Sequence, residues 1–262
     1  MINSKLPEVG TTIFSKMSAL ANQHGAINLS QGFPGFEVEK TLTSLVTKYM
    51  NEGKNQYAPM PGVMELRDTL ANYLNKTYQC EINPETEITI TAGATQAIYN
   101  TISAIIHEGD EVILFSPAYD CYAPAIEVHG GIPLFIPLEY PDYSINWENV
   151  EEMITSKTKL IMINSPHNPT GSSINRANWA SLVELIKDKN IYVLSDEVYE
   201  GIFFDDDAHF NPRSIEAIRD RLISVYSFGK SCHMTGWKVG YAIANPELSS
   251  EIRKLHQYFT FS

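Results

Sequence analysis

Four polar residues could form one reactive site. They are Asn168, Asp196, Tyr199 and Lys230, and each follows an apolar, β-branched segment. In open α/β sheets, ligands bind outside the carboxyl ends of the strands, so side chains at these points can meet. A lysine amine in a partly apolar pocket beside other cations has a lowered pKa and becomes a nucleophile that can form a Schiff base. Tyr199, three residues after Asp196, would face the same side if the chain turns helically there.

Each of these residues also has an ordinary structural explanation. A lysine is usually a surface residue, an aspartate is a good helix N-cap, and an Asn-Pro pair such as Asn168-Pro169 is common turn chemistry. A carboxylate directly after an apolar strand is costly to desolvate, however, unless it meets a cation or a hydrogen-bond donor. Four such residues in order, each at a predicted strand end, are poorly explained by chance, so the combined pattern favours one shared site.

An anion site is predicted at the segment TAGATQA, residues 91–97. Gly93 and the small Ala94 let backbone N–H groups approach an anion, and a helix that begins near Thr95 adds its partial positive charge. A glycine turn with a threonine cap is also an ordinary helix start. Ser227 and Lys238 could help to neutralise a dianionic phosphate. Together with the Schiff-base lysine, these groups are the set that a pyridoxal phosphate site requires.

The elements that must position these residues follow an α/β rhythm, with β-branched apolar runs between helical patterns. Seven strands are predicted, at Ile88–Thr91, Glu111–Phe115, Pro133–Leu138, Leu160–Asn164, Tyr192–Ser195, Ile223–Ser227 and Val239–Ala244. Helices are predicted at Met64–Tyr78, Thr95–Ile106, Cys121–His129, Asn146–Thr155, Arg176–Lys189 and Glu247–Tyr258. The spacing predicts a mainly parallel sheet with helices on both faces. Proline and glycine break up the first 60 residues, which we expect to form an arm or cap outside the sheet.

Composition excludes several classes of protein. The chain has 262 residues and a formal net charge of −12, without the dense Lys/Arg run that phosphate-backbone binding needs, so a nucleic-acid role is disfavoured. No stretch is apolar enough to span a bilayer, and the N-terminus lacks the pattern of a signal peptide, so we expect a cytoplasmic protein. The three cysteines form no CxxC pair, which predicts reduced thiols and no metal site. The glycine fingerprint GxGxxG is absent, which disfavours a nicotinamide-binding module.

The sequence resembles a class I aminotransferase of pyridoxal-phosphate fold type I, from the methionine and kynurenine aminotransferase branch. The resemblance extends over the whole chain and includes LSQGFPGF, NQYAPMPG, SPAYDCY, SPHNPTG, SDEVYE and SFGKSCHMTGWKVGY. It implies that residues 1–40 are an N-terminal arm and part of a small domain, and that residues 41–262 are the large pyridoxal phosphate-binding domain. Relatives continue into a C-terminal small domain that supplies an arginine for the substrate carboxylate, and we expect that domain to be absent from this chain.

The resemblance also implies residue roles. Lys230 would hold pyridoxal 5′-phosphate as a Schiff base, Asp196 would pair with the protonated ring nitrogen, and Tyr199 would hydrogen-bond the ring oxygen together with Asn168. Tyr119 would stack on the ring. The phosphate would be held by Gly93, Ala94, Thr95, Ser227 and Lys238, with Tyr57 reaching across from the second subunit of a homodimer. The substrate would meet Gly32, Phe14 and Asn168.

The predicted function is transfer of an amino group from a methionine-like or aromatic amino acid to a 2-oxo acid, impaired if the C-terminal domain is missing. Two alternatives stay open. One is a carbon–sulfur β-lyase on the same fold, because a common carbanion can expel a β-substituent instead of being reprotonated. The other, from a different class, is a truncated non-catalytic scaffold that dimerises.

Overall fold

A seven-stranded sheet forms the centre of the protein, in the strand order β1-β7-β6-β5-β4-β2-β3. The structure is a computed structural model that describes residues 2–32, 36–203 and 209–262, so part of the segment LSQGFPGF lies outside the described residues. β7 runs antiparallel to β1 and β6, and the other neighbouring strands pair in parallel. The strands are β1 (Ile88–Thr91), β2 (Glu111–Ser116), β3 (Ile132–Pro137), β4 (Thr158–Asn164), β5 (Tyr192–Asp196), β6 (Leu222–Ser227) and β7 (Gly240–Ile243). The prediction of a mainly parallel sheet is confirmed.

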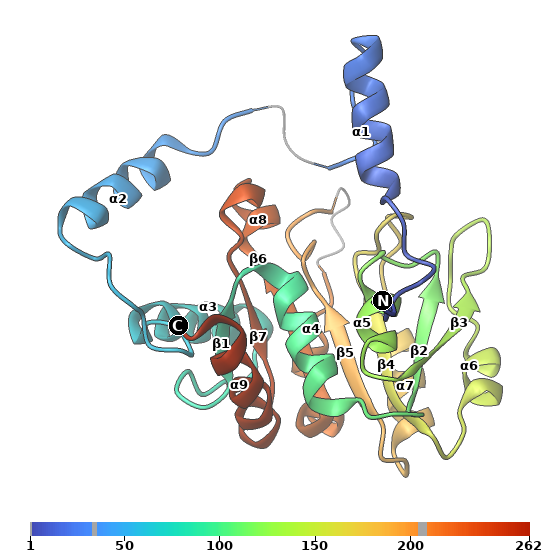
Figure 1. Ribbon diagram of the computed structural model, residues 1–262. Helices are drawn as coiled ribbons and strands as arrows, with labels where there is room; N and C mark the ends of the chain where they lie inside the picture. Colours follow the sequence, from blue (N-terminus) through green and yellow to red (C-terminus); the bar gives the residue numbers. More distant parts are fainter. Residues whose placement is uncertain (1, 33–35, 204–208) are drawn as a thin grey trace.

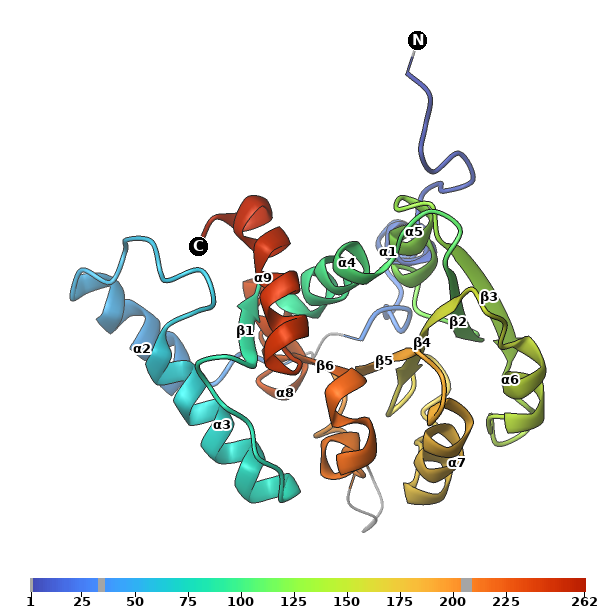
Figure 2. The same cartoon turned by 90° about the horizontal axis from the view of Figure 1, so that it is seen from below.

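Helices cover both faces of this sheet (Figure 2). One face packs against α4 (Gly93–Ile105), α5 (Tyr122–Glu127) and α9 (Pro246–Thr260), which contribute Ile98, Ile126 and Ile252 to a shared apolar core. The other face carries α3 (Met64–Tyr78), α6 (Trp147–Met153) and α7 (Arg176–Ile186). There Trp179 and Leu182 are fully buried against the strands. Short helical turns complete the fold, at η1 (Pro212–Ser214), η2 (Glu216–Arg221), α8 (Phe228–Ser231) and η3 (Thr235–Trp237).

The start of α4 differs from its prediction. The helix begins at Gly93 instead of Thr95, immediately after β1, and Thr95 is therefore a residue of its first turn and not a cap. Gly93 makes this sharp transition with a φ of 77°, in the left-handed region that glycine tolerates. The backbone N–H of Ala92 donates to Oε1 of Gln96 at 2.6 Å, so a glutamine side chain closes the turn.

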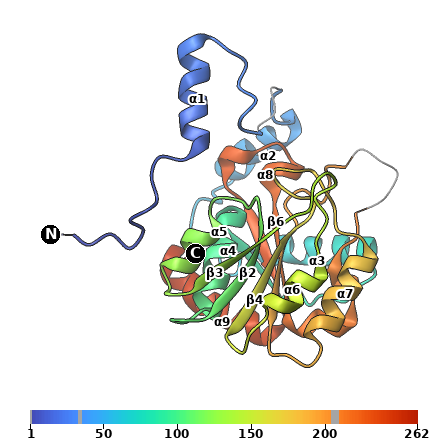
Figure 3. The same cartoon turned by 90° about the vertical axis from the view of Figure 1, so that its right-hand side faces the viewer.

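The N-terminal segment forms two helices that the sequence reading did not predict, α1 (Ile13–His24) and α2 (Lys40–Asn51). Thr12 caps α1 by accepting from the N–H of Ser15, and Gly25 ends it in the left-handed conformation. Neither helix has a buried residue, and both lie away from the sheet (Figures 1 and 3). Among residues 2–32 and 36–60, none belongs to the sheet, as expected. None of the helices in the described ranges is long and apolar enough to cross a membrane.

Candidate active site

A cavity of about 430 Å³ opens at the carboxyl ends of the central strands. It is walled by the start of α4, the ends of β4 and β5, the α8 turn and the N-terminal segment. The structure brings almost all the predicted site residues together here. The lining includes Phe14, Gly32, Gly93, Ala94, Thr95, Tyr119, Asn168, Asp196, Tyr199, Ser227, Lys230 and Lys238. Tyr57 does not line this cavity; it is 79% exposed, and its ring contacts Phe261.

Lys230 projects into the cavity from α8, the single turn that follows β6. Ser227 caps this turn, because its Oγ accepts from the N–H of Gly229 at 3.1 Å. Burial lowers the pKa of the Lys230 amine, the positive charge of Lys238 lowers it further, and the negative charge of Asp196 opposes them. A lowered pKa leaves more of the amine uncharged near neutral pH, which is the form that attacks a carbonyl carbon.

Asp196 is the last residue of β5 and is only 4% exposed. Its Oδ2 accepts from the hydroxyl of Tyr122 at 2.6 Å, and its Oδ1 accepts from the N–H of Val198 at 3.3 Å. Burial raises the pKa of Asp196 to about 6, although these two hydrogen bonds act in the opposite direction. Asp196 is thus a buried carboxylate on the cavity wall and not an exposed helix cap, and it can pair with a cationic group of a ligand.

An anion cradle forms where α4 begins. Gly93, Ala94 and Thr95 present the helix N-terminus to the cavity, with its unpaired N–H groups and partial positive charge. The ammonium of Lys238 is packed so closely that a Cβ added at Gly93 would lie 3.1 Å from its Nζ. A helix N-terminus combined with a lysine ammonium suits a dianionic phosphate.

Asn164 connects the ends of two strands at the site, and the sequence reading did not single it out. Its Nδ2 donates to the carbonyl of Asp196 at 2.9 Å, while its Oδ1 accepts from the N–H of Asn168 at 2.7 Å. Asn164 and Asp196 are also register partners in the parallel β4–β5 pair. Asn164 therefore holds the turn that carries Asn168 against the strand that carries Asp196.

Two tyrosines of the segment SPAYDCY differ in what they touch. Tyr119 lines the cavity, and burial raises its pKa to about 12. Tyr122, whose hydroxyl contacts Asp196, meets the ring of Tyr119 edge-on, with centroids 5.7 Å apart. The sequence predicts a role for Tyr119 but none for Tyr122. The signal was present, since both belong to one quoted motif, but a periodic pattern does not tell which hydroxyl reaches the acid.

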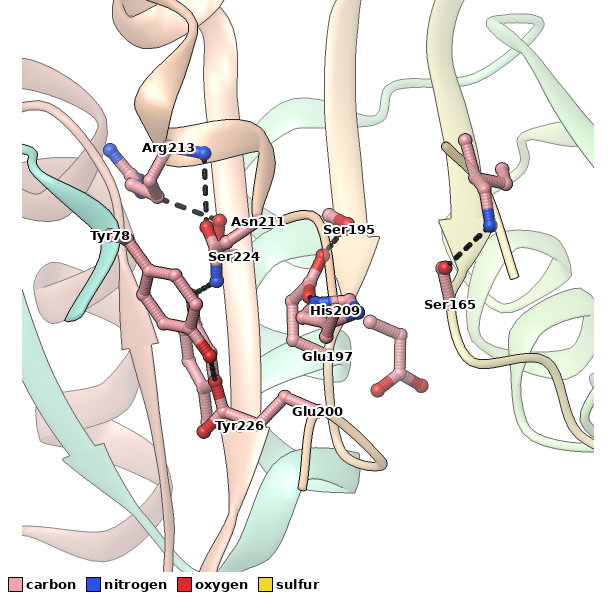
Figure 4. A network of polar contacts seen from close by, with 12 residues as sticks. Tyr78, Ser165, Ser195, Glu197, Glu200, His209, Asn211, Arg213, Ser224 and Tyr226 are labelled. Atoms are coloured by element: carbon pink, nitrogen blue, oxygen red, sulfur yellow. Dashed lines mark hydrogen bonds and ion pairs between the residues drawn. The ribbon is translucent and has the colours of Figure 1, made fainter. Parts of the chain in front are cut away.

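A second polar network lies behind the site, anchored by residues that follow β5 (Figure 4). Glu197 is fully buried, and it accepts a hydrogen bond from Ser195 and contacts Nε2 of His209. Burial alone would lower the pKa of His209, but the contact with Glu197 and the negative charges of Glu197 and Glu200 together raise it. Glu200 accepts from the hydroxyl of Tyr78 in α3 at 2.7 Å. These contacts fix the turn that presents Tyr199 to the cavity.

Comparison with known proteins agrees with this geometry. Residues 24–262 match the family model for aminotransferase class I and II. The chain is 47% identical to the methionine aminotransferase of Escherichia coli over 259 residues, which cover 99% of this chain and 67% of that protein. It is 35% identical to the kynurenine–oxoglutarate transaminase of Dictyostelium discoideum, with 97% of this chain and 62% of that protein covered.

Solved structures give the same result. The crystal structure of YbdL from Escherichia coli, for which a methionine aminotransferase function was identified, superposes with a TM-score of 0.98 at 46% identity and covers 100% of this chain and 69% of that one. The N-succinyldiaminopimelate aminotransferase of Mycobacterium tuberculosis superposes with a TM-score of 0.95 at 33% identity and covers 100% of this chain and 68% of that one. The chain spans about two thirds of the length of these relatives. It belongs to the class I and II aminotransferase family.

Proposed function

We propose that this chain binds pyridoxal 5′-phosphate through Lys230 and transfers an amino group from a methionine-like or aromatic amino acid to a 2-oxo acid. Class I aminotransferases use this cofactor. The observation that carries the proposal is that one cavity holds an amine of lowered pKa, a buried carboxylate and an anion cradle, supplied by Lys230, Asp196 and the start of α4. The amine suits an aldehyde, the carboxylate suits a protonated ring nitrogen, and the cradle suits a phosphate, and pyridoxal 5′-phosphate carries all three groups.

Each proposed role follows from the contacts of the side chain. When bound, the cofactor supplies an electron sink for the carbanion that forms when the α-proton leaves. Asp196 stabilises the positive charge on the ring nitrogen, which a shielded carboxylate does more strongly than water. Lys230 would hold the cofactor through its Nζ, and as a general base and acid it would move the proton at the substrate α-carbon. Tyr199 and Asn168 would hydrogen-bond the oxygen on the cofactor ring, and Tyr119 would support the ring by stacking.

The substrate side of the cavity is formed by the N-terminal segment. Phe14 and Leu29 give it apolar walls, and we assign the backbone N–H of Gly32 to the substrate carboxylate. An apolar wall of this kind suits a thioether or an aromatic side chain better than a charged one. The relatives named as methionine and kynurenine aminotransferases support the same substrate class.

The proposed functional form is a cytoplasmic homodimer. Tyr57 is exposed and outside the cavity of its own chain, which fits a role in the cavity of a second copy. The absence of buried residues in α1 and α2 leaves their apolar faces for such a contact. Within the protomer, we propose that residues 1–40 act as an arm and residues 41–262 as the cofactor-binding domain. The three free cysteines suit a reducing compartment.

A steady-state assay of the chain loaded with pyridoxal 5′-phosphate tests the proposed reaction. Methionine and a 2-oxo acid should give the matching amino acid, and the Lys230→Ala variant should give none. Release of pyruvate and a thiol from a cysteine conjugate, without any 2-oxo acid, would instead favour the β-lyase. A loaded chain whose visible spectrum is unchanged by every amino acid would favour the non-catalytic scaffold.

A further inference from the structure

The phenol oxygen of Tyr122 lies 2.6 Å from Oδ2 of Asp196, nearer than the other hydrogen-bond partners of Asp196 among the described residues. Both residues are 4% exposed, so water does not compete for this hydrogen bond. Tyr122 is the first residue of α5 and Asp196 is the last of β5, so the contact ties a helix start to a strand end. Tyr122 itself is not part of the cavity lining, whereas Asp196 is.

Tyr122 is the donor and Asp196 the acceptor in this hydrogen bond, because the phenol is a much weaker acid than the carboxyl group. Burial raises the pKa of Tyr122 well above its usual value, and the charge of Asp196 raises it further, so the phenol keeps its proton and donates. For Asp196, burial raises the pKa to about 6, and the bond from Tyr122 is the largest influence that lowers it. A donor to a carboxylate favours its ionised form.

Tyr122 also contacts Tyr119, the residue that we expect to stack on the cofactor ring. Its ring packs edge-on against that of Tyr119, at an interplanar angle of 77°. The same side chain thus touches the acid at the cavity wall and supports the aromatic ring that faces the cavity. Removing the hydroxyl of Tyr122 would leave its ring packed against Tyr119 and would take away only the hydrogen-bond donor to Asp196.

We propose that Tyr122 is a positioning residue that keeps the Asp196 carboxylate ionised and fixes its orientation toward the ring nitrogen of the cofactor. The inference rests on the proposed function for the identity of that partner, but the effect on Asp196 belongs to the chain itself. Other titratable groups surround Tyr122 and Asp196, namely Tyr119, Cys121, Glu197, Tyr199 and Lys230. His167 and Tyr122 line the same small second cavity.

The test is a pH titration of the Asp196 side-chain carboxyl carbon by NMR in the cofactor-free chain, with the resonance assigned from an Asp196→Asn variant. The Tyr122→Phe variant should raise the midpoint by about one pH unit, because hydrogen bonds to charged groups are worth roughly that much. Tyr192→Phe is the matched control, since Tyr192 lies at the opposite end of β5 and should leave the midpoint unchanged. An unmoved midpoint in Tyr122→Phe would overturn the proposal.

A second measurement needs no substitution. In the unmodified chain, the phenol carbon resonance of Tyr122 should shift with the same midpoint as the Asp196 carboxyl carbon, because the acceptor of its hydrogen bond changes charge. Different midpoints would contradict the proposal even if the variant did not fold. Failure of the proposed function shows separately, as a chain that forms no adduct at Lys230 with pyridoxal 5′-phosphate, whatever the midpoint of Asp196.

Discussion

Lys230 donates a hydrogen bond from its Nζ to the carbonyl of Gly32, 3.2 Å away, although the two residues are 198 positions apart in the chain. The contact holds the N-terminal segment at the cavity that the strand ends form, where Phe14 and Leu29 also line the wall. Figure 1 shows α1 above the same end of the sheet. The same amine lies 5.4 Å from the ring centroid of Tyr199. The lysine is therefore held between the arm and the sheet, where burial and neighbouring charges govern its acidity.

The Lys238→Met variant tests how charge controls the Lys230 amine. Removing the positive charge should let the pKa of Lys230 rise, so less of the amine is uncharged at neutral pH. Formation of the Schiff base with pyridoxal, which lacks the phosphate, should become severalfold slower, and its rate-against-pH profile should move to higher pH. Stopped-flow absorbance measures this rate. Lys254→Met, on the exposed side of α9, is the control, and an equal effect there would refute the explanation.

The Gly93→Ala variant tests the anion cradle. The added methyl would crowd the ammonium of Lys238, and the φ of 77° is strained for alanine, at a cost of about 1–2 kcal/mol. Affinity for pyridoxal 5′-phosphate should fall about tenfold, whereas affinity for pyridoxal should change little. Equilibrium dialysis gives both constants. Gly236→Ala is the control, because a Cβ added there meets nothing within 4 Å, and this variant should bind both ligands normally. Equal losses of affinity for both ligands in Gly93→Ala would argue against a phosphate site.

The buried acid Glu200 predicts a pH dependence of stability. Burial raises its pKa from 4.5 to about 7, against the opposing hydrogen bond from Tyr78. The folded state then binds this proton more tightly than the unfolded state, so the contribution to stability is full below about pH 4.5 and is lost as pH rises toward 7. Glu200→Gln should flatten this part of the profile in urea denaturation. Glu152 is an exposed acid on α6, so Glu152→Gln should leave the pH profile of stability unchanged. An unaltered slope of unfolding free energy against pH in Glu200→Gln would contradict the assignment.

The Leu182→Ala variant separates folding from chemistry. Leu182 is fully buried on the face of the sheet that carries α7, away from α4 and α5. Truncating it should lower the free energy of unfolding by about 2–5 kcal/mol, because a large apolar side chain leaves a cavity. Urea denaturation measures the loss, while the visible spectrum of the loaded, folded variant should match that of the unaltered chain. A changed spectrum would show that the two faces are coupled.

The sheet and its strand-end residues were predictable because their signals are local. The apolar runs of β1 and α3 predict the bounds that the structure shows, Ile88–Thr91 and Met64–Tyr78. The helices α1 and α2 were not predictable in this way, since neither contains a buried residue in the part of the chain that the structure describes, and proline and glycine flank them. Asn164 and Tyr122 were missed for a different reason. Their roles depend on strand register and on a contact across 74 residues, which spacing along the chain does not encode.

We propose that a single amine, that of Lys230, carries the cofactor. The direct measurement is borohydride reduction of the chain loaded with pyridoxal 5′-phosphate, followed by protease digestion and mass spectrometry of the peptides. We expect one pyridoxyl group, on the peptide that contains Lys230, and its loss in Lys230→Ala. A pyridoxyl group found chiefly on Lys238 or on surface lysines, or a protein that stays colourless in excess cofactor, would contradict it.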